Sequence, residues 1–206
     1  MIILDFGSGE TCKNNRRYIE RMIDELAAVD TGKQEVIIKW QLFDTIYYQD
    51  RKLASLEHHA FYHAKRYAEK YGYKTTASVF DKKSIDFLAA FDIPFIKIAN
   101  REEIYSFIHY IQQYDKKIIM SISKLALIVP GIDFMCCVSK YPAEPEEYIE
   151  RFSDFLHFGL SDHTTDFFLY NKYKPRIYEC HYKLEDSTGP DAGPFARTPA
   201  QLKEIL

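Results

Sequence analysis

The stretch LHFGLSDHTTDFFLYNKYKPRIYECH, residues 156–181, reads as a strand, a helix and a second strand. Its apolar runs at 156–160 and 176–181 flank an amphipathic segment, and such a crossover joins two parallel strands. Each run leads into polar residues that include a histidine, His163 after the first and His181 at the end of the second. Because parallel strands end at the same edge of a sheet, we expect these two clusters to form two walls of one site.

The same alternation extends along the whole chain. Eight strands separated by helices predict a (β/α)8 TIM-type barrel, minimal at 206 residues and built as one domain over residues 1–206. The predicted strands are 2–6, 35–41, 73–79, 94–99, 117–121, 132–138, 156–160 and 176–181. The predicted helices are 14–29, 51–71, 82–91, 101–114, 144–154, 165–173 and 198–206.

One crossover is too short for an ordinary helix. Ten residues separate Ser121 from Ile132, whereas a parallel crossover usually takes a dozen or more. The helix after strand five is therefore predicted to be missing or reduced to a stunted turn at 124–129, or the barrel is locally open. The Gly- and Pro-rich stretch 185–198 is predicted to be a loop.

Composition narrows the class of protein. Hydrophobic residues make up 47% of the chain and predict a globular fold. A net charge of −3 gives no reason to expect a nucleic acid or a membrane as partner. The four cysteines form no disulfide or zinc-finger pattern, and we expect reduced thiols in a cytoplasmic protein. No transmembrane run or signal peptide is recognised in the sequence.

Polar residues interrupt the strands near their carboxyl ends, where a buried parallel strand should be apolar. They are Asp5, Lys39, Gln41, Lys97, Ser121, Ser139, Tyr141, Ser161, Asp162, His163, Glu179 and His181. Each lysine could simply pair with a carboxylate such as Asp5 or Glu179, since a buried ammonium needs a partner. Repetition at the same end of seven strands instead favours an active site, because barrel enzymes place theirs at that end. Two lysines with several hydroxyls suit a substrate that carries phosphate and carboxylate groups.

The two histidines suggest a metal site. Two neutral imidazoles, His163 and His181, make a weak site for a divalent ion and leave positions open for water and substrate oxygen, which favours Mn²⁺ or Mg²⁺ over zinc. Glu179 could be a further ligand or could orient His181. A hydrogen-bonded structural role is the alternative for each histidine. We assign that role to the others, which are His58, His59, His63, His109 and His157.

Several segments, taken in order, resemble the catalytic barrel of the sialic acid synthase family, which condenses phosphoenolpyruvate with an N-acetylated amino sugar. They are VIIKWQLF (36–43), TASVFDKKSIDFLAAFDIPFIKIANREE (76–103), KKIIMSIS (116–123), CCVSKYPAEPEE (136–147), FGLSDHT (158–164), YECHYKLEDSTGPD (178–191) and TPAQLKEI (198–205). The SDHT, [EK]xH and GPD elements are fairly specific in this order.

The resemblance implies roles for individual residues. His163 and His181 match the family's manganese ligands, and Glu102 matches its general acid/base. Asp191, within GPD, matches an aspartate that holds the amino sugar. Asp5 stands where the family has a glutamate, and it is expected to be catalytic together with Glu102. The expected phosphoenolpyruvate contacts and their neighbours are Lys39, Gln41, Ser78, Lys97, Asn100, Ser121, Ser139, Tyr141 and Ser161.

The chain also departs from the family pattern. The first strand reads Asp5-Phe6-Gly7 in place of Glu-Ile-Gly, and the Asn-His pair that follows in the family is absent. Ser-Gly-Glu around the acid/base is replaced by Asn100-Arg101-Glu102. The antifreeze-like domain that follows the barrel in full-length members has no counterpart in these 206 residues, so the family's swapped dimer is not implied, although an oligomer is possible. The phosphoenolpyruvate and metal half is expected to be retained and the sugar half rebuilt.

Three functions are consistent with the sequence. The first is a synthase that joins phosphoenolpyruvate to an N-acetylated amino sugar and forms a nonulosonic acid with the help of Mn²⁺. The second is a non-catalytic barrel that binds the metal or phosphoenolpyruvate. The third is a metal-dependent aldolase for a smaller aldehyde. All three have small-molecule ligands.

Overall fold

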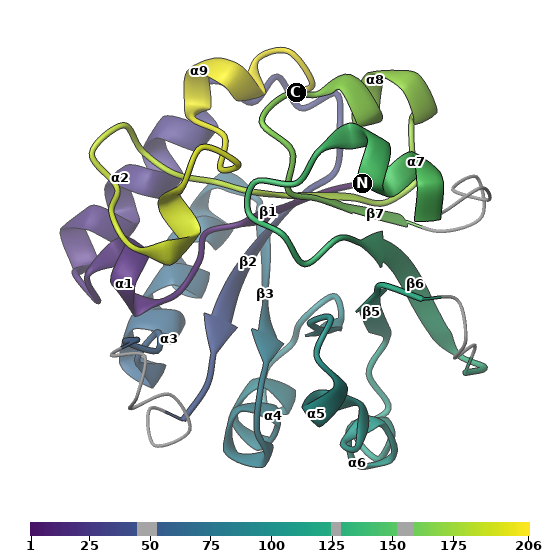
Figure 1. The fold of residues 1–206 in the computed structure, drawn as a ribbon. Coiled ribbons are helices and arrows are strands. Elements are labelled where there is room, and N and C mark those ends of the chain that lie inside the picture. The colour runs from purple at the N-terminus through teal and green to yellow at the C-terminus, as the bar shows by residue number, and fades with distance from the viewer. Residues whose placement is uncertain (45–52, 125–128, 152–158) are drawn as a thin grey trace.

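A computed structural model of the protein describes residues 1–44, 53–124, 129–151 and 159–206. Within these residues, eight parallel strands form a closed barrel in which each strand pairs with the next and the last pairs with the first (Figure 1). The strands are β1 (Ile2–Asp5), β2 (Val36–Leu42), β3 (Lys74–Val79), β4 (Ile96–Ile98), β5 (Ile118–Ile122), β6 (Ile132–Cys137), β7 (Gly159–Asp162) and β8 (Tyr178–His181). The predicted (β/α)8 barrel is therefore confirmed, and each predicted strand overlaps an observed one.

Helices surround the strands (Figure 1). They are α1 (Gly9–Cys12), α2 (Arg16–Ala27), α3 (His58–Ala68), η2 (Glu69–Tyr71), α4 (Lys82–Ala89), α5 (Glu102–Tyr105), α6 (Ile108–Gln112), α7 (Pro145–Arg151), α8 (Phe168–Tyr173), η4 (Pro190–Ala192) and α9 (Pro199–Leu202). Among the described residues, none of these helices is long and apolar enough to cross a membrane.

Two predicted helices differ from the observed ones, the first in where it begins and the second in being divided. The helix predicted at 14–29 begins at Arg16, because the left-handed backbone of Lys13 and Asn14 ends α1 and the Asn15 side chain caps α2. The helix predicted at 101–114 divides into the short helices α5 and α6. Between β5 and β6 the described residues contain no helix, as expected, and residues 125–128 of the predicted stunted turn lie outside them.

The strands bury both faces, and each face has its own core. Outward-facing residues pack under the helices, as Trp40 does beside Phe6 with ring centroids 5.1 Å apart. The barrel interior is filled by a separate apolar cluster of Ile3, Ile37, Phe95, Ile119, Met135 and Ile177. Gly159 completes this layer, since a Cβ there would lie 2.8 Å from Met135 Cγ. The interior is thus a packed plug, and whatever stands above it on the same strand faces lies at the barrel mouth.

The chain also brings distant segments together near the mouth. In Figure 1 the loop that carries η4 lies beside α1. Gly7 (φ +76°) leaves no room for a Cβ, which would lie 2.8 Å from the Cβ of Asp191. The close approach of these two loops therefore depends on a glycine at this position, and it places Asp191 over the end of β1.

We predict that helix α3 is held mainly by its buried face. Phe61→Ala should lower the free energy of unfolding by about 3–5 kcal/mol, because Phe61 is fully buried and leaves a cavity. Tyr62→Ala is the matched control: its ring is 54% exposed, so the change should stay within about 0.5 kcal/mol. Urea unfolding of both variants measures the difference, and equal effects would contradict the packing described for α3.

Candidate functional site

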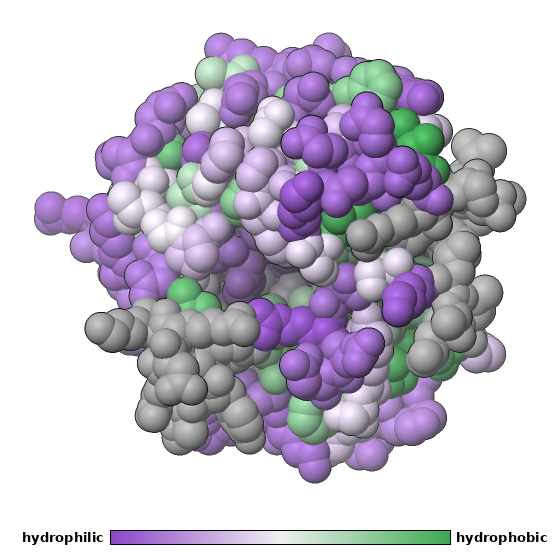
Figure 2. Space-filling model, viewed as in Figure 1, coloured by the Kyte–Doolittle hydropathy of each residue, from purple (hydrophilic) through white to green (hydrophobic). Residues whose placement is uncertain are grey.

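A cavity of about 480 Å³ opens at the carboxyl ends of the strands. It is lined by residues from all eight strands or the loops that follow them, and its size suits a small molecule. Nearly every residue expected from the sequence lines it: Asp5, Lys39, Gln41, Ser78, Lys97, Asn100, Ser121, Ser139, Tyr141, Ser161, Asp191, His163 and His181. Figure 2 shows that the face drawn there is mostly hydrophilic and is hollowed near its middle.

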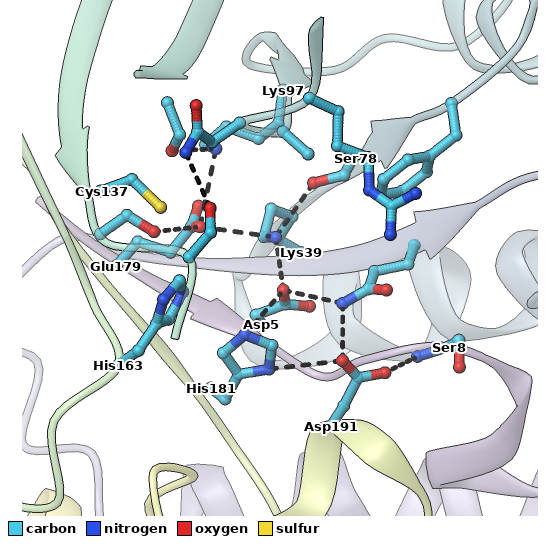
Figure 3. A pocket seen from close by; sticks show the side chains of 18 of the residues that line it. Asp5, Ser8, Lys39, Ser78, Lys97, Cys137, His163, Glu179, His181 and Asp191 are labelled. Atoms are coloured by element: carbon cyan, nitrogen blue, oxygen red, sulfur yellow. Dashed lines mark hydrogen bonds and ion pairs between the residues drawn. The ribbon is translucent and has the colours of Figure 1, made fainter. Parts of the chain in front are cut away.

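Lys39 is the most strongly held cation in the cavity. Its ammonium lies 2.6 Å from Asp5 Oδ2, 3.0 Å from Ser78 Oγ and 3.6 Å from Glu179 Oε1 (Figure 3). Burial opposes its charge, but Asp5 and Glu179 outweigh burial and raise the pKa of Lys39. Burial likewise works against the Asp5 carboxylate, yet Lys39 and then His181 hold the pKa of Asp5 well below its usual value. This pair therefore stays ionised.

Lys97 is held less strongly. Its ammonium donates to Ser121 Oγ at 2.7 Å and to the Ile98 carbonyl at 3.3 Å, and its nearest carboxylate oxygen, on Glu179, is 3.6 Å away. Burial lowers the pKa of Lys97; the charge of Glu179 opposes the shift, and that of Lys39 adds to it. An anionic ligand beside Lys97 would supply the negative charge that its surroundings provide only in part.

Glu179 lies between the two lysines (Figure 3). Its Oε1 accepts a hydrogen bond from Ser161 Oγ at 3.2 Å and faces both ammonium groups, while its Oε2 is buried without a hydrogen-bond partner among the described residues. Cys137 lines the same wall, where burial raises the pKa of its thiol to about 11 and keeps it neutral. Sequence reasoning missed Cys137, although its two-residue spacing from Met135 places it on the inner face of β6.

The two histidines stand together next to Glu179 and Ser161, each two residues further along its strand, His181 on β8 and His163 just after β7. Their ring centroids are 5.5 Å apart, and Tyr141 lies 4.1 Å from the ring of His163. The Nδ1 of His163 lies 2.6 Å from the Val138 carbonyl, so in the neutral ring Nδ1–H donates there and Nε2 keeps its lone pair. Burial, aided by the charge of His181, lowers the pKa of His163 to about 3. His163 is therefore neutral over the ordinary pH range.

His163 and His181 could supply only some of the ligands that a metal ion needs. Neutral His163 with its Nδ1 bound to a carbonyl has the form that metal-binding histidines take, and His181 Nδ1 is buried without a hydrogen-bond partner among the described residues. The described part of the chain places no three His, Cys, Asp or Glu side chains so that together they could hold a metal ion. The two histidines thus suit an ion that takes its remaining ligands from water and substrate.

A third group of polar residues surrounds His181. Asp5 Oδ2 lies 3.8 Å from His181 Nε2, and Asp191 Oδ1 lies 3.7 Å from His181 Nδ1. The amide of Gln41 donates to both carboxylates, at 3.1 and 3.0 Å, and the backbone N–H of Ser8 donates to Asp191 Oδ2 at 3.3 Å. Burial raises the pKa of Asp191 despite its neighbour His181. These oxygens and amides suit a ligand rich in hydroxyls.

Glu102 is the one expected site residue that does not line this cavity. It is exposed in the first turn of α5 and lines a neighbouring cavity of about 510 Å³ with Tyr105 and Lys124. Asn100 and Ser139 line both cavities, and their side chains are joined by a 2.8 Å hydrogen bond. The structure therefore places Glu102 behind the wall of the main cavity rather than in it.

Fold and site together define a (β/α)8-barrel protein with a small-molecule cavity that combines buried cations with paired histidines. The chain belongs to the NeuB family, whose model matches residues 20–206. The resemblance to sialic acid synthases noted from the motifs is thereby confirmed. No curated protein sequence matches the chain.

The barrel is similar to that of several solved structures. The N-acetylneuraminic acid (sialic acid) synthetase of Leptospira borgpetersenii aligns with 98% of this chain and 80% of its own, at a TM-score of 0.73 and 20% identity. The spore coat polysaccharide biosynthesis protein SpsE of Bacillus subtilis aligns with 99% of this chain and 65% of its own, at a TM-score of 0.75 and 20% identity. A truncated 3-deoxy-D-arabino-heptulosonate 7-phosphate synthase of Thermotoga maritima aligns with 99% of this chain and 82% of its own, at a TM-score of 0.68 and 11% identity.

The depressed pKa of His163 predicts a measurable proton linkage. Between its folded value of about 3 and the ordinary value of 6.5, the unfolded chain binds one more proton here than the folded chain. Stability from this group is therefore complete above pH 6.5 and falls as the pH drops, by up to about 1.4 kcal/mol per pH unit. His163→Gln should flatten the curve of unfolding free energy against pH from 4 to 7, measured with a chelator present. An unchanged slope would show that His163 takes up its proton at the same pH in the folded protein as in the unfolded chain.

Proposed function

We propose that the protein condenses phosphoenolpyruvate with an N-acetylated amino sugar aldehyde to give a nonulosonic acid of the sialic acid kind. The observation that carries the proposal is the pair of buried lysines, Lys39 and Lys97, each beside a hydroxyl and both facing the cavity that the two histidines line. A ligand with two anionic groups close together matches two ammonium groups placed in this way. Membership of the NeuB family supports the same reaction class.

In this reaction, different residues of the cavity bind different parts of the two substrates. Lys39 and Lys97, with Ser78, Ser121 and Ser161, bind the phosphate and carboxylate of phosphoenolpyruvate. Asp191 and Gln41 bind hydroxyl groups of the sugar, since a carboxylate accepts and an amide both donates and accepts. Bound in this way, the vinyl carbon of phosphoenolpyruvate and the sugar aldehyde meet above the apolar plug.

The chemistry balances with one water molecule. The vinyl carbon forms a bond to the aldehyde carbon, and the aldehyde oxygen takes up a proton. Water adds to the adjacent carbon and gives up one proton. The C–O bond to phosphate then breaks, the new hydroxyl passes its remaining proton to the departing phosphate, and a 2-keto acid and inorganic phosphate are left. The two lysines hold negative charge throughout, in a site from which their burial excludes much of the water.

We assign a divalent metal, Mn²⁺ or else Mg²⁺, to His163 and His181. The neutral form of His163 and the Nδ1 of His181, which has no hydrogen-bond partner among the described residues, support this assignment. When bound, such an ion supplies Lewis acidity beside the sugar. The ring of Phe195, 5.0 Å from that of His181, and Tyr141 shield this corner and limit the motion of both imidazoles.

The position of Glu102 favours a second candidate, a barrel that binds phosphoenolpyruvate or metal without turnover. An acid/base must lie within hydrogen-bond reach of the proton it moves, and here Glu102 lines a neighbouring cavity that shares only Asn100 and Ser139 with the main one. Calorimetry separates the candidates, because a binding barrel takes up phosphoenolpyruvate but releases no phosphate from it.

We predict Mn²⁺-dependent release of phosphate from phosphoenolpyruvate when a six-carbon N-acetylated amino sugar is supplied. His163→Ala and His181→Ala should each lower kcat/KM by about 100-fold or more, because each removes a metal ligand. His109→Ala is the control, since His109 lies on α6 and bonds to Gln112 away from the cavity. Failure to release phosphate with any such sugar would refute the synthase.

A second prediction concerns Glu102. If it carries the proton, Glu102→Gln should lower kcat by about 100-fold or more with little change in KM for phosphoenolpyruvate. Glu103→Gln is matched to it, because Glu103 is the next residue, exposed in the same first turn. Wild-type rates in Glu102→Gln would show that the acid/base lies elsewhere, in agreement with the position of Glu102 behind the wall.

A further inference from the structure

A buried tyrosine hydroxyl joins helix α7 to the end of β7. Tyr148 is fully buried, and its hydroxyl donates to the Ser161 carbonyl at 2.8 Å while it accepts the backbone N–H of His163 at 3.0 Å. Both bonds are made to the backbone of residues 161–163, and the side chains of Ser161 and His163 line the cavity. Tyr148 is not among the site residues expected from the sequence.

The Tyr148 hydroxyl accepts the backbone N–H of His163, and the contact of His163 with the Val138 carbonyl, next to β6, is made by its ring. Ser161 on β7 is paired with Cys137 on β6, and Val138 follows Cys137. The Val138 carbonyl is bound by the ring Nδ1 of His163, and the backbone N–H of His163 is bound by Tyr148. The ring and the backbone of one histidine thus have separate acceptors, and Tyr148 supplies the second.

We infer that Tyr148 is a positioning residue, which fixes the tautomer and direction of the His163 ring through the backbone. Without the hydroxyl, the buried N–H of His163 would lose its acceptor, and a buried N–H rarely stays unpaired. It would compete with the ring for the Val138 carbonyl. The ring would then no longer be held with Nδ1–H inward and Nε2 free.

The same hydroxyl also holds the Ser161 carbonyl, and Ser161 Oγ donates to Glu179 between the two lysines. Loss of the hydroxyl should therefore disturb His163 most and Glu179, with the two lysines beside it, less. The consequence for ion binding rests on the metal role proposed for His163, whereas the effect on the ring itself does not.

Tyr148→Phe removes the hydroxyl and keeps the ring. Tyr182→Phe is the matched control, because Tyr182 is also fully buried and its hydroxyl donates to the Met22 carbonyl at 2.9 Å, outside the cavity lining. Calorimetry with Mn²⁺ should show about a 10-fold or greater loss of affinity in Tyr148→Phe and little change in Tyr182→Phe. Imidazole nitrogen NMR of metal-free protein should show one His163 tautomer in the wild type and the control, and a mixture in Tyr148→Phe.

The outcomes are distinct. Wild-type Mn²⁺ affinity together with a single tautomer in Tyr148→Phe overturns the inference. If the wild type binds no Mn²⁺, the metal proposal fails, and the tautomer alone decides: a mixture in Tyr148→Phe supports the role of Tyr148, and a single tautomer overturns it. Should Tyr148→Phe not fold, 4-aminophenylalanine at this position keeps a donor for the Ser161 carbonyl. Its amine nitrogen is a poor hydrogen-bond acceptor, so the backbone N–H of His163 still lacks its partner. A mixture of His163 tautomers in that variant supports the inference, and a single tautomer overturns it.

Discussion

The buried ion pair between Lys39 and Asp5 is the constraint on which the site depends. Both side chains are about 3% exposed, and strand register sets them directly side by side on β2 and β1. A charge buried in this way is tolerated only with a partner and further hydrogen bonds, which Ser78, Gln41 and the backbone N–H of Gly7 provide. Asp5 is also paired in register with His181, so its carboxylate contacts both Lys39 and that histidine.

The barrel interior has two layers of opposite character. The lower layer is apolar and closed, whereas the upper layer consists of charges and hydroxyls that stand two residues further along the same strands. Ile177, just before β8, belongs to the plug, and Glu179 and His181 on β8 follow it on the same face. The apolar plug lies directly below the charged groups and helps to bury them. This burial lowers the pKa values of Lys97 and His163.

The strands and the polar residues at their ends could be predicted from the sequence, because a two-residue period converts position directly into face. Lys39, Lys97, Ser161 and Glu179 were found in this way. Features that depend on loops were not accessible by the same reasoning. The orientation of α5 places Glu102 outside the main cavity, and the contact between Tyr148 and His163 joins a helix to a strand end through one hydroxyl. The assigned metal, an oligomeric state and a cytoplasmic location stay predictions.

The pairing of β1 with β8 has a consequence for how the protein forms. Ile2 on β1 is paired with Tyr178 on β8, so the first strand of the barrel waits for the last before its second edge is covered. Contacts so distant in sequence are slow to form because the intervening chain must first be ordered. Asp5 meets His181 only at that step. We therefore expect closure of the sheet and completion of the site to coincide late in folding, so that a chain whose barrel is still open has no complete site.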